Sequence, residues 1–251
     1  MLTHPILEQL LELKLHGMHR ALREQLQRND LHPLSFEERF GLLLDREMTE
    51  RSDRRLQTRL RAARLRHQAC VEDIDYRHRR GLDRRLVQQL ASGHYLERGL
   101  NLLITGPAGV GKTWLACALA HKACRDGYTA RYLRLPRLLQ ELPLAKADGR
   151  YAKLLRDYAK ADLIILDDWG LMPMSDEARR DILEILDDRH NRKSTIVTSQ
   201  LPTEKWHDYI AEPTFADAIL DRLVHNAYRM ALSGESMRKT TVNLTEPTHS
   251  E

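Results

Sequence analysis

The sequence contains few cysteines and no long apolar run. Its 251 residues include three cysteines, and these do not have the paired spacing of a metal site. No apolar segment approaches the roughly 18 residues that a membrane helix needs, and the first residues lack a signal-peptide pattern. We therefore expect a protein of the reducing cytoplasm that makes no contact with a membrane.

Acidic residues are almost absent between residues 51 and 66. Asp53 is the one acid there, against seven arginines. This excess favours a polyanionic partner such as duplex DNA, because each phosphate contact releases condensed counterions. The alternative is a solvated helix face. The candidate DNA contacts in this segment are Arg54, Arg55, Arg59 and Arg61.

Residues 1–70 have the apolar spacing of helices. From Leu7 to Leu26, apolar residues recur every three or four positions, which places them on one helix face. Ser35 and Glu38 have the spacing of a capping box that would start a second helix, and a third is expected farther on. The residues of the second helix that we expect to face inward are Phe36, Phe40, Leu43 and Leu44. The sequence thus predicts a small helical bundle with a basic surface over residues 1–70.

From Leu100 onward, short apolar runs alternate with helical patterns. The runs expected to form strands are 100–105, 131–135, 163–166, 195–198 and 227–232. Such alternation is typical of an α/β fold with a parallel, doubly wound sheet. We expect this second domain over residues 71–245, followed by a loose tail over 246–251.

Residues 106–113 read Gly-Pro-Ala-Gly-Val-Gly-Lys-Thr and match the phosphate-binding pattern G-x-x-x-x-G-K-[ST] in full. Glycines let successive backbone N–H groups turn toward phosphate oxygens, and the following helix adds a favourable dipole. Lys112 is expected to reach the β- and γ-phosphates of ATP, and Thr113 to offer its hydroxyl to Mg²⁺. The predicted ATP contacts are Gly106, Pro107, Ala108, Gly109, Val110, Gly111, Lys112, Thr113 and Trp114.

Two later strands end in polar residues. The run 163–166 delivers Asp167 and Asp168 at its carboxyl end, where ligands of parallel sheets bind. Asp167 is predicted to hold Mg²⁺, and Asp168 to orient the attacking water in ATP hydrolysis. The run 195–198 is followed by Ser199 and Gln200, and Gln200 is our first candidate to bridge the γ-phosphate and the water, with Ser199 second.

Two arginines near the end of the chain have the setting of catalytic side chains. Arg222 follows Asp221, and Arg238 closes a Gly-Glu-Ser-Met-Arg segment. An arginine presented by a neighbouring subunit can stabilise the charge of a transition state. Each could instead form a surface salt bridge.

These motifs, in this order, resemble those of AAA+ ATPases in the initiator and helicase-loader group. The segments 59–65 and 71–76 are similar to the basic and then acidic stretch that precedes the ATPase domain of the IstB family, which assists insertion-sequence transposases. The resemblance covers nearly the whole chain. It implies a parallel-sheet AAA+ fold, self-association into a nucleotide-dependent oligomer, and assembly on duplex DNA.

The resemblance also implies residue roles. Arg222 matches the arginine finger that acts on a neighbouring subunit, and Arg238 matches the second sensor arginine. The region of the initiator-type helical insertion corresponds to residues 137–160, so the added DNA-contact candidates are Arg137, Lys146, Arg150 and Lys153. Asp168 stands where many AAA+ ATPases have glutamate, and the sequence after Arg238 is short for a full helical lid.

The function that we expect is that of an ATPase that binds duplex DNA and helps a transposase. One alternative is a DnaC-like loader of a replicative helicase, since the nucleotide motifs do not separate the two. The other is a P-loop kinase of a small metabolite, against which the basic helical segment argues.

Overall fold

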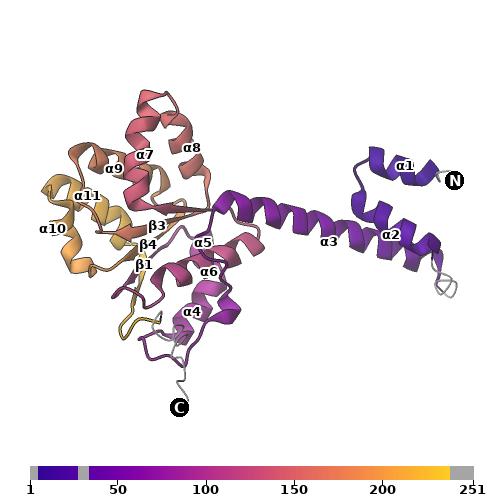
Figure 1. The fold of residues 1–251 in the computed structure, drawn as a ribbon, viewed down its shortest axis with the longest axis horizontal. Helices are drawn as coiled ribbons and strands as arrows, with labels where there is room; N and C mark the ends of the chain where they lie inside the picture. Colours follow the sequence, from indigo (N-terminus) through magenta and orange to yellow (C-terminus); the bar gives the residue numbers. More distant parts are fainter. Residues whose placement is uncertain (1–4, 28–33, 238–251) are drawn as a thin grey trace, which may run out of the picture. The chain divides into compact units, whose positions relative to one another are not determined.

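The computed structural model describes residues 5–27 and 34–237, and the chain divides into two compact units, 1–58 and 59–251 (Figure 1). Three helices begin the chain: α1 (Pro5–Glu12), α2 (His16–Gln27) and α3 (Phe36–Ala63). Helix α3 runs across the division without interruption. The domain boundary expected at residue 70 therefore stays a prediction.

The first unit is held together by a small core and one buried carboxylate. Leu10, Met18 and Leu43 are among its buried apolar residues. Glu47 of α3 is 7% exposed and accepts hydrogen bonds from the backbone N–H groups of Gly17, at 2.6 Å, and Met18, at 3.1 Å. The α3 carboxylate thus satisfies N–H groups in the first turn of α2 that have no partner within the helix.

The start of α3 follows the sequence prediction, but its interior does not. Ser35 and Glu38 form the capping box, with reciprocal hydrogen bonds of 3.2 and 2.7 Å. Two separate helices were expected after residue 35, and this was wrong, because the stretch contains no proline and a single glycine. Phe36, Phe40 and Leu44 were expected to face inward, and this was wrong as well, because all three are exposed, Phe36 by 68%.

The second unit is built on a five-stranded, fully parallel sheet. Its strand order is β2-β3-β4-β1-β5. The strands are β1 (Asn101–Thr105), β2 (Ala130–Arg134), β3 (Leu163–Trp169), β4 (Ser194–Ser199) and β5 (Ala227–Ala231). All five lie where the sequence predicted them, and the α/β class is confirmed.

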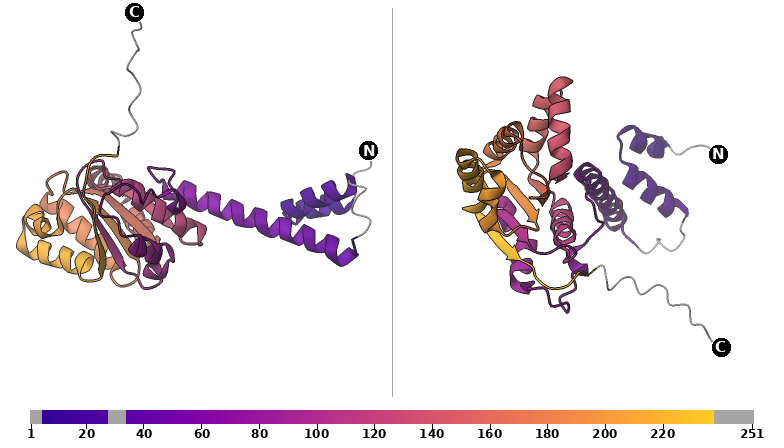
Figure 2. Two further views of the ribbon diagram at one scale, coloured as in Figure 1. Left: turned by 90° about the horizontal axis from the view of Figure 1, so that it is seen from below. Right: turned by 60° about the vertical axis from the view of Figure 1, so that its left-hand side comes forward.

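Helices cover both faces of this sheet (Figures 1 and 2). The longer ones are α4 (Arg84–Ala91), α6 (Lys112–Arg125), α7 (Leu135–Ala147), α8 (Tyr151–Lys160), α9 (Asp176–Arg189) and α11 (Pro213–Val224). The shorter ones are α5 (His94–Glu97), α10 (Trp206–Ile210) and the 3₁₀ turns η1 (Val71–Asp73) and η2 (Thr203–Lys205). One core cluster of this unit includes Trp169, Trp206 and Ile182. Cys117 and Cys124 are buried on α6. Across residues 5–27 and 34–237, no helix is both long and apolar enough to cross a membrane.

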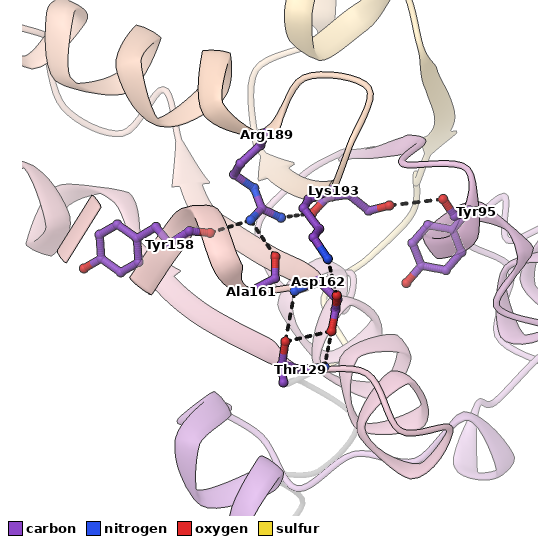
Figure 3. Close-up of polar contacts among 8 residues, drawn as sticks. Tyr95, Thr129, Tyr158, Ala161, Asp162, Arg189 and Lys193 are labelled. Atoms are coloured by element: carbon purple, nitrogen blue, oxygen red, sulfur yellow. Dashed lines mark hydrogen bonds and ion pairs between the residues drawn. The ribbon is translucent and has the colours of Figure 1, made fainter. Parts of the chain in front are cut away.

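Arg189, at the end of α9, fastens the amino ends of two strands (Figure 3). Its guanidinium is 1% exposed and donates to the backbone oxygens of Tyr158, at 2.5 Å, Ala161, at 2.7 Å, and Ser194. Burial lowers the pKa of Arg189, because the interior disfavours its charge. The guanidinium has five N–H donors, and its hydrogen bonds to backbone carbonyls offset the cost of burying the charge. The arginine therefore fixes where β3 and β4 begin.

Replacing Arg189 with methionine should lower the free energy of unfolding by about 3 kcal/mol, because buried carbonyls lose their donors. Urea denaturation of the full chain measures this loss. Arg180→Met is the matched control, since Arg180 lies exposed on the same helix. An effect of Arg189→Met no larger than that of the control would contradict the structural role.

Candidate nucleotide-binding site

The loop between β1 and α6 has the geometry of a phosphate cradle. Gly109 and Gly111 have φ angles of +86° and +94°, which side-chain-bearing residues rarely adopt. Helix α6 begins at Lys112, so the loop leads directly into a helix N-terminus. The strand, loop and helix that the motif requires are therefore all present, and the N–H groups at the start of α6 add a favourable setting for an anion.

The Lys112 ammonium lies inside this loop. It donates 2.7 Å hydrogen bonds to the backbone oxygens of Gly106 and Pro107, and the residue is 9% exposed. An ammonium on a flexible stem is a compact point charge with three donors. The loop backbone holds this charge where the phosphates of a nucleotide would lie.

Asp167 is the most buried functional group of the site. It is 0% exposed, and its Oδ1 accepts a 2.7 Å hydrogen bond from the Thr113 hydroxyl and another from the Thr198 hydroxyl. Its Oδ2 accepts from the Tyr132 hydroxyl and lies 3.6 Å from Nη1 of Arg66. Burial raises the pKa of Tyr132, and the hydrogen bond to Asp167 adds to this shift, so the phenol stays a donor.

The Thr113 and Asp167 oxygens suit Mg²⁺. Magnesium in nucleotide sites keeps several waters and binds one or two protein oxygens plus the phosphates. The 2.7 Å contact between a hydroxyl and a carboxylate at the first turn of α6 provides these oxygens. The described residues contain no cluster of three or more His, Cys, Asp or Glu side chains that could hold a metal alone, so the phosphates would be needed to complete the coordination.

Asp168 lies beside Asp167 but in a different environment. Its φ angle of +62° is uncommon for a residue with a side chain, and the register between β3 and β4 shifts at this point. Its Oδ2 accepts a 2.6 Å hydrogen bond from Nε of Arg134, and its side chain is 22% exposed. The irregularity separates this carboxylate from the buried network around Asp167 and leaves it paired with Arg134 on β2.

The residues at the end of β4 differ in their surroundings. Ser199 is buried, and its hydroxyl donates to the backbone oxygen of Trp169 at 2.7 Å. Gln200 follows β4 and is exposed. Thr198 contacts Asp167 and also accepts from the backbone N–H of Asp168 at 3.4 Å.

Trp114, another predicted ATP contact, packs in a cluster with Leu65, Ala69 and Tyr132, among others, on one side of α6.

Arg222 is not brought to the P-loop of its own chain. Its backbone oxygen accepts a 2.8 Å hydrogen bond from Asn101, the first residue of β1, whereas the P-loop follows the other end of that strand. The guanidinium forms an ion pair with Asp187 and donates to the Ala218 oxygen at 2.9 Å. It lines a surface cavity of about 630 Å³ along α11.

Arg238 lies outside the described residues. The backbone N–H of Met237, the residue before it, donates to the Gly109 oxygen at 3.1 Å.

Some of the candidate DNA contacts are held in hydrogen bonds or ion pairs within the protein, and others are exposed without an ion-pair partner among the described residues. Arg59 donates to the Cys124 oxygen at 2.8 Å, and Lys146 pairs with Glu177 and Asp181 at 2.8 and 2.7 Å. Hydrogen bonds to Asp181 and Glu177 raise the pKa of Lys146. Arg150 pairs with its near neighbour Asp148 at 2.7 Å. The candidates that are exposed and form no ion pair with another described residue are Arg54, Arg55, Arg61, Arg137 and Lys153.

Sequence reasoning missed four side chains of this site. They are Arg66, Tyr132, Arg134 and Thr198. Tyr132 and Arg134 lie on β2, whose Arg134 pairs in register with Asp167. The residue pattern of 130–134 predicts a strand. It does not predict that this strand lies beside β3 and therefore faces Asp167 and Asp168, because that depends on the strand order. Thr198 could have been found, since it closes the same apolar run that led to Gln200.

The whole chain is similar to proteins of bacterial insertion sequences. The insertion sequence ATP-binding protein y4pL of Sinorhizobium fredii is 56% identical over 95% of this chain and 98% of its own length. That of IS1162 from Pseudomonas fluorescens is 53% identical over 81% and 88%, and that of IS21 from Pseudomonas aeruginosa is 33% identical over 91% and 86%.

Solved structures show the same fold at low identity. DnaI matches with a TM-score of 0.57 and 23% identity, over 66% of this chain and 91% of that one. The DnaC helicase loader matches with 0.54 and 21%, over 65% and 96%. The family model described as IstB-like ATP binding protein matches residues 8–245. This chain, with its P-loop on a five-stranded parallel sheet, therefore belongs to the IstB-like family of ATP-binding proteins associated with insertion sequences.

Proposed function

We propose that this protein is an ATPase that assembles on duplex DNA and assists the transposase of an insertion sequence. The observation that carries the proposal is the contact between Thr113 and the buried Asp167, beside the Lys112 ammonium. Relatives named as insertion-sequence ATP-binding proteins support the biological setting. A cytoplasmic location fits a protein that acts on chromosomal DNA.

Each residue of the site has a distinct task in this proposal. Lys112 and the loop N–H groups bind the phosphates, and Thr113 and Asp167 hold Mg²⁺, which neutralises charge on the phosphates when bound. Asp168 orients and deprotonates the attacking water, with Arg134 fixing its carboxylate. In this proposal Gln200 would bridge the water and the γ-phosphate, and Arg238, which lies outside the described residues, would contact the nucleotide as a sensor.

The position of Arg222 supports a shared active site. The arginine lies at the amino end of β1, so it would serve the nucleotide of a neighbouring subunit and not its own. Its guanidinium would exchange Asp187 for the developing charge on the γ-phosphate. Hydrolysis then depends on self-association, and bound ATP favours it.

Duplex DNA would contact the exposed arginines of α3 together with Arg137, Arg150 and Lys153 on the ATPase domain. Lys146 is a weaker candidate than the others, because two carboxylates already neutralise it. The segment 1–70 would act as a separate domain that contacts DNA, the transposase or neighbouring subunits. Residues 71–245 would form the ATPase domain, with a short tail over 246–251.

A helicase loader is the second candidate, favoured by the fold that the chain shares with DnaC and DnaI. At identities of 23% and below, that likeness concerns the fold alone. The insertion-sequence names of closer relatives favour a transposase as the partner. Pull-down of an insertion-sequence transposase from the same cells, and not of the replicative helicase, distinguishes the two.

Lys112→Ala should abolish ATP binding, because the loop loses the charge that faces the phosphates. Binding of a fluorescent ATP analogue measures this effect, and thermal unfolding of the variant checks that the fold survives. ATP-dependent assembly on DNA should be lost in parallel. Assembly that continues unchanged in Lys112→Ala would contradict nucleotide control.

Neutralising three α3 arginines should flatten the salt dependence of DNA binding. Each lost phosphate contact reduces the slope of log K against log[salt] by about 0.9. Fluorescence anisotropy with a labelled duplex at several salt concentrations measures it. The residues to be changed to glutamine are Arg54, Arg55 and Arg61. The matched control changes three exposed arginines of the second unit to glutamine, namely Arg85, Arg98 and Arg180. Equal slopes for both triple variants would place the DNA surface elsewhere.

Arg222→Ala should bind ATP normally and lose hydrolysis, because the transition state loses a positive charge supplied from outside the subunit. Asp168→Asn should lose hydrolysis for a separate reason, since it removes the base. Mixing the two inactive variants creates interfaces that contain both an intact Asp168 and an intact Arg222. Phosphate release should return in the mixture, and a mixture as inactive as its components would refute the shared site.

A further inference from the structure

The end of α3 is fastened to α6 and β2 of the second unit. Arg131 donates to the backbone oxygen of Ala62, and Arg59 donates to that of Cys124 on α6. Arg64 then has a φ angle of +51°, which ends the helix and turns the chain. Leu65 packs in the cluster that contains Trp114 and Tyr132. The segment 59–65 is therefore attached to α6 and β2 by both polar and apolar contacts.

Arg66 follows this turn and reaches the buried Asp167. Its Nη1 lies 3.6 Å from Asp167 Oδ2. The other partners of that carboxylate are the hydroxyls of Thr113, Thr198 and Tyr132. The three hydroxyls occupy three of the roughly four lone-pair positions of the carboxylate, and the Arg66 guanidinium faces Oδ2 as an ion-pair partner. A cation that approaches Oδ2 therefore meets the positive charge of Arg66.

Arg66 is the partner most easily displaced. It is the one positive charge among the four, its side chain is 44% exposed, and its 3.6 Å contact exceeds hydrogen-bond length. The three hydroxyls belong to α6, β2 and β4 of the sheet core. A hydrogen bond to Tyr132 raises the pKa of Arg66, so the guanidinium stays charged. Because an uncompensated buried carboxylate is costly, the charge of Arg66 also stabilises Asp167.

We propose that Arg66 is a positioning residue that competes with the divalent cation for Asp167 and thereby transmits the state of the nucleotide site to α3. The inference rests on the proposed role of Thr113 and Asp167 in holding Mg²⁺. A cation bound there repels the guanidinium, because two like charges lie within a few ångströms of one another. The contact of Arg66 with Asp167 then weakens, and with it one attachment of the helix that carries the candidate DNA-binding arginines.

The first test is cation affinity. Mn²⁺ binding to the full chain with a non-hydrolysable ATP analogue can be followed by electron paramagnetic resonance. Arg66→Gln and Arg66→Met should bind Mn²⁺ about tenfold more tightly than the wild type, because a nearby positive charge is gone. Arg66→Lys should keep the wild-type affinity. Arg64→Gln is the matched control, with the same charge change two residues away, and should shift the affinity far less.

The second test is the coupling to α3. Hydrogen exchange of backbone amides in residues 59–70 should rise in the wild type when Mg²⁺ is added to the nucleotide complex. In Arg66→Gln the rise should be lost, and in Arg66→Lys it should remain. If the wild type binds nucleotide and Mn²⁺ but the Arg66→Gln and Arg66→Met variants bind Mn²⁺ no more tightly than the wild type, the role of Arg66 is overturned and the proposed function is not. A wild type that binds no nucleotide would overturn the proposed function.

Discussion

The carboxylate of Asp167 has no exposed surface, and the folded second unit must supply all its partners. They come from four separate parts of the chain: the start of α6, β2, the end of β4 and the segment that follows α3. Burying an unpaired charge would cost several kcal/mol, roughly, so the strand order and the attachment of α3 are tied to this one group. The same contacts position the P-loop, because Thr113 is the last residue of the loop motif and donates its hydroxyl hydrogen to Asp167.

Asp168, next to Asp167 in the sequence, lies in a different environment because the backbone is irregular at this point. A shift in register between β3 and β4 and the left-handed backbone of Asp168 separate two adjacent aspartates into different settings. One is buried and suited to a cation, and the other is partly exposed and held by Arg134. Two carboxylates in one motif can then take two chemical roles, because environment and not residue type distinguishes them.

Local patterns predicted the parts of the site that lie close together in the sequence. The glycine-rich loop and the apolar run before Asp167 carry their own signals, and the five strands followed from periodicity. Tyr132 and Thr198 could be placed only with the order of the strands, and Arg66 only with the turn at Arg64. The long α3 was predicted as two helices, since apolar spacing does not reveal where a solvent-exposed helix continues. Arg238 lies outside the described residues.

We propose that ATP bound at this site holds subunits together on duplex DNA. Sedimentation velocity of a labelled duplex, at one fixed salt concentration, tests it most directly with Mg²⁺–ATP, with Mg²⁺–ADP and without nucleotide. The account predicts a complex of several subunits per duplex with Mg²⁺–ATP and a much smaller one in the other two states. The same sedimentation coefficient in all three would contradict it.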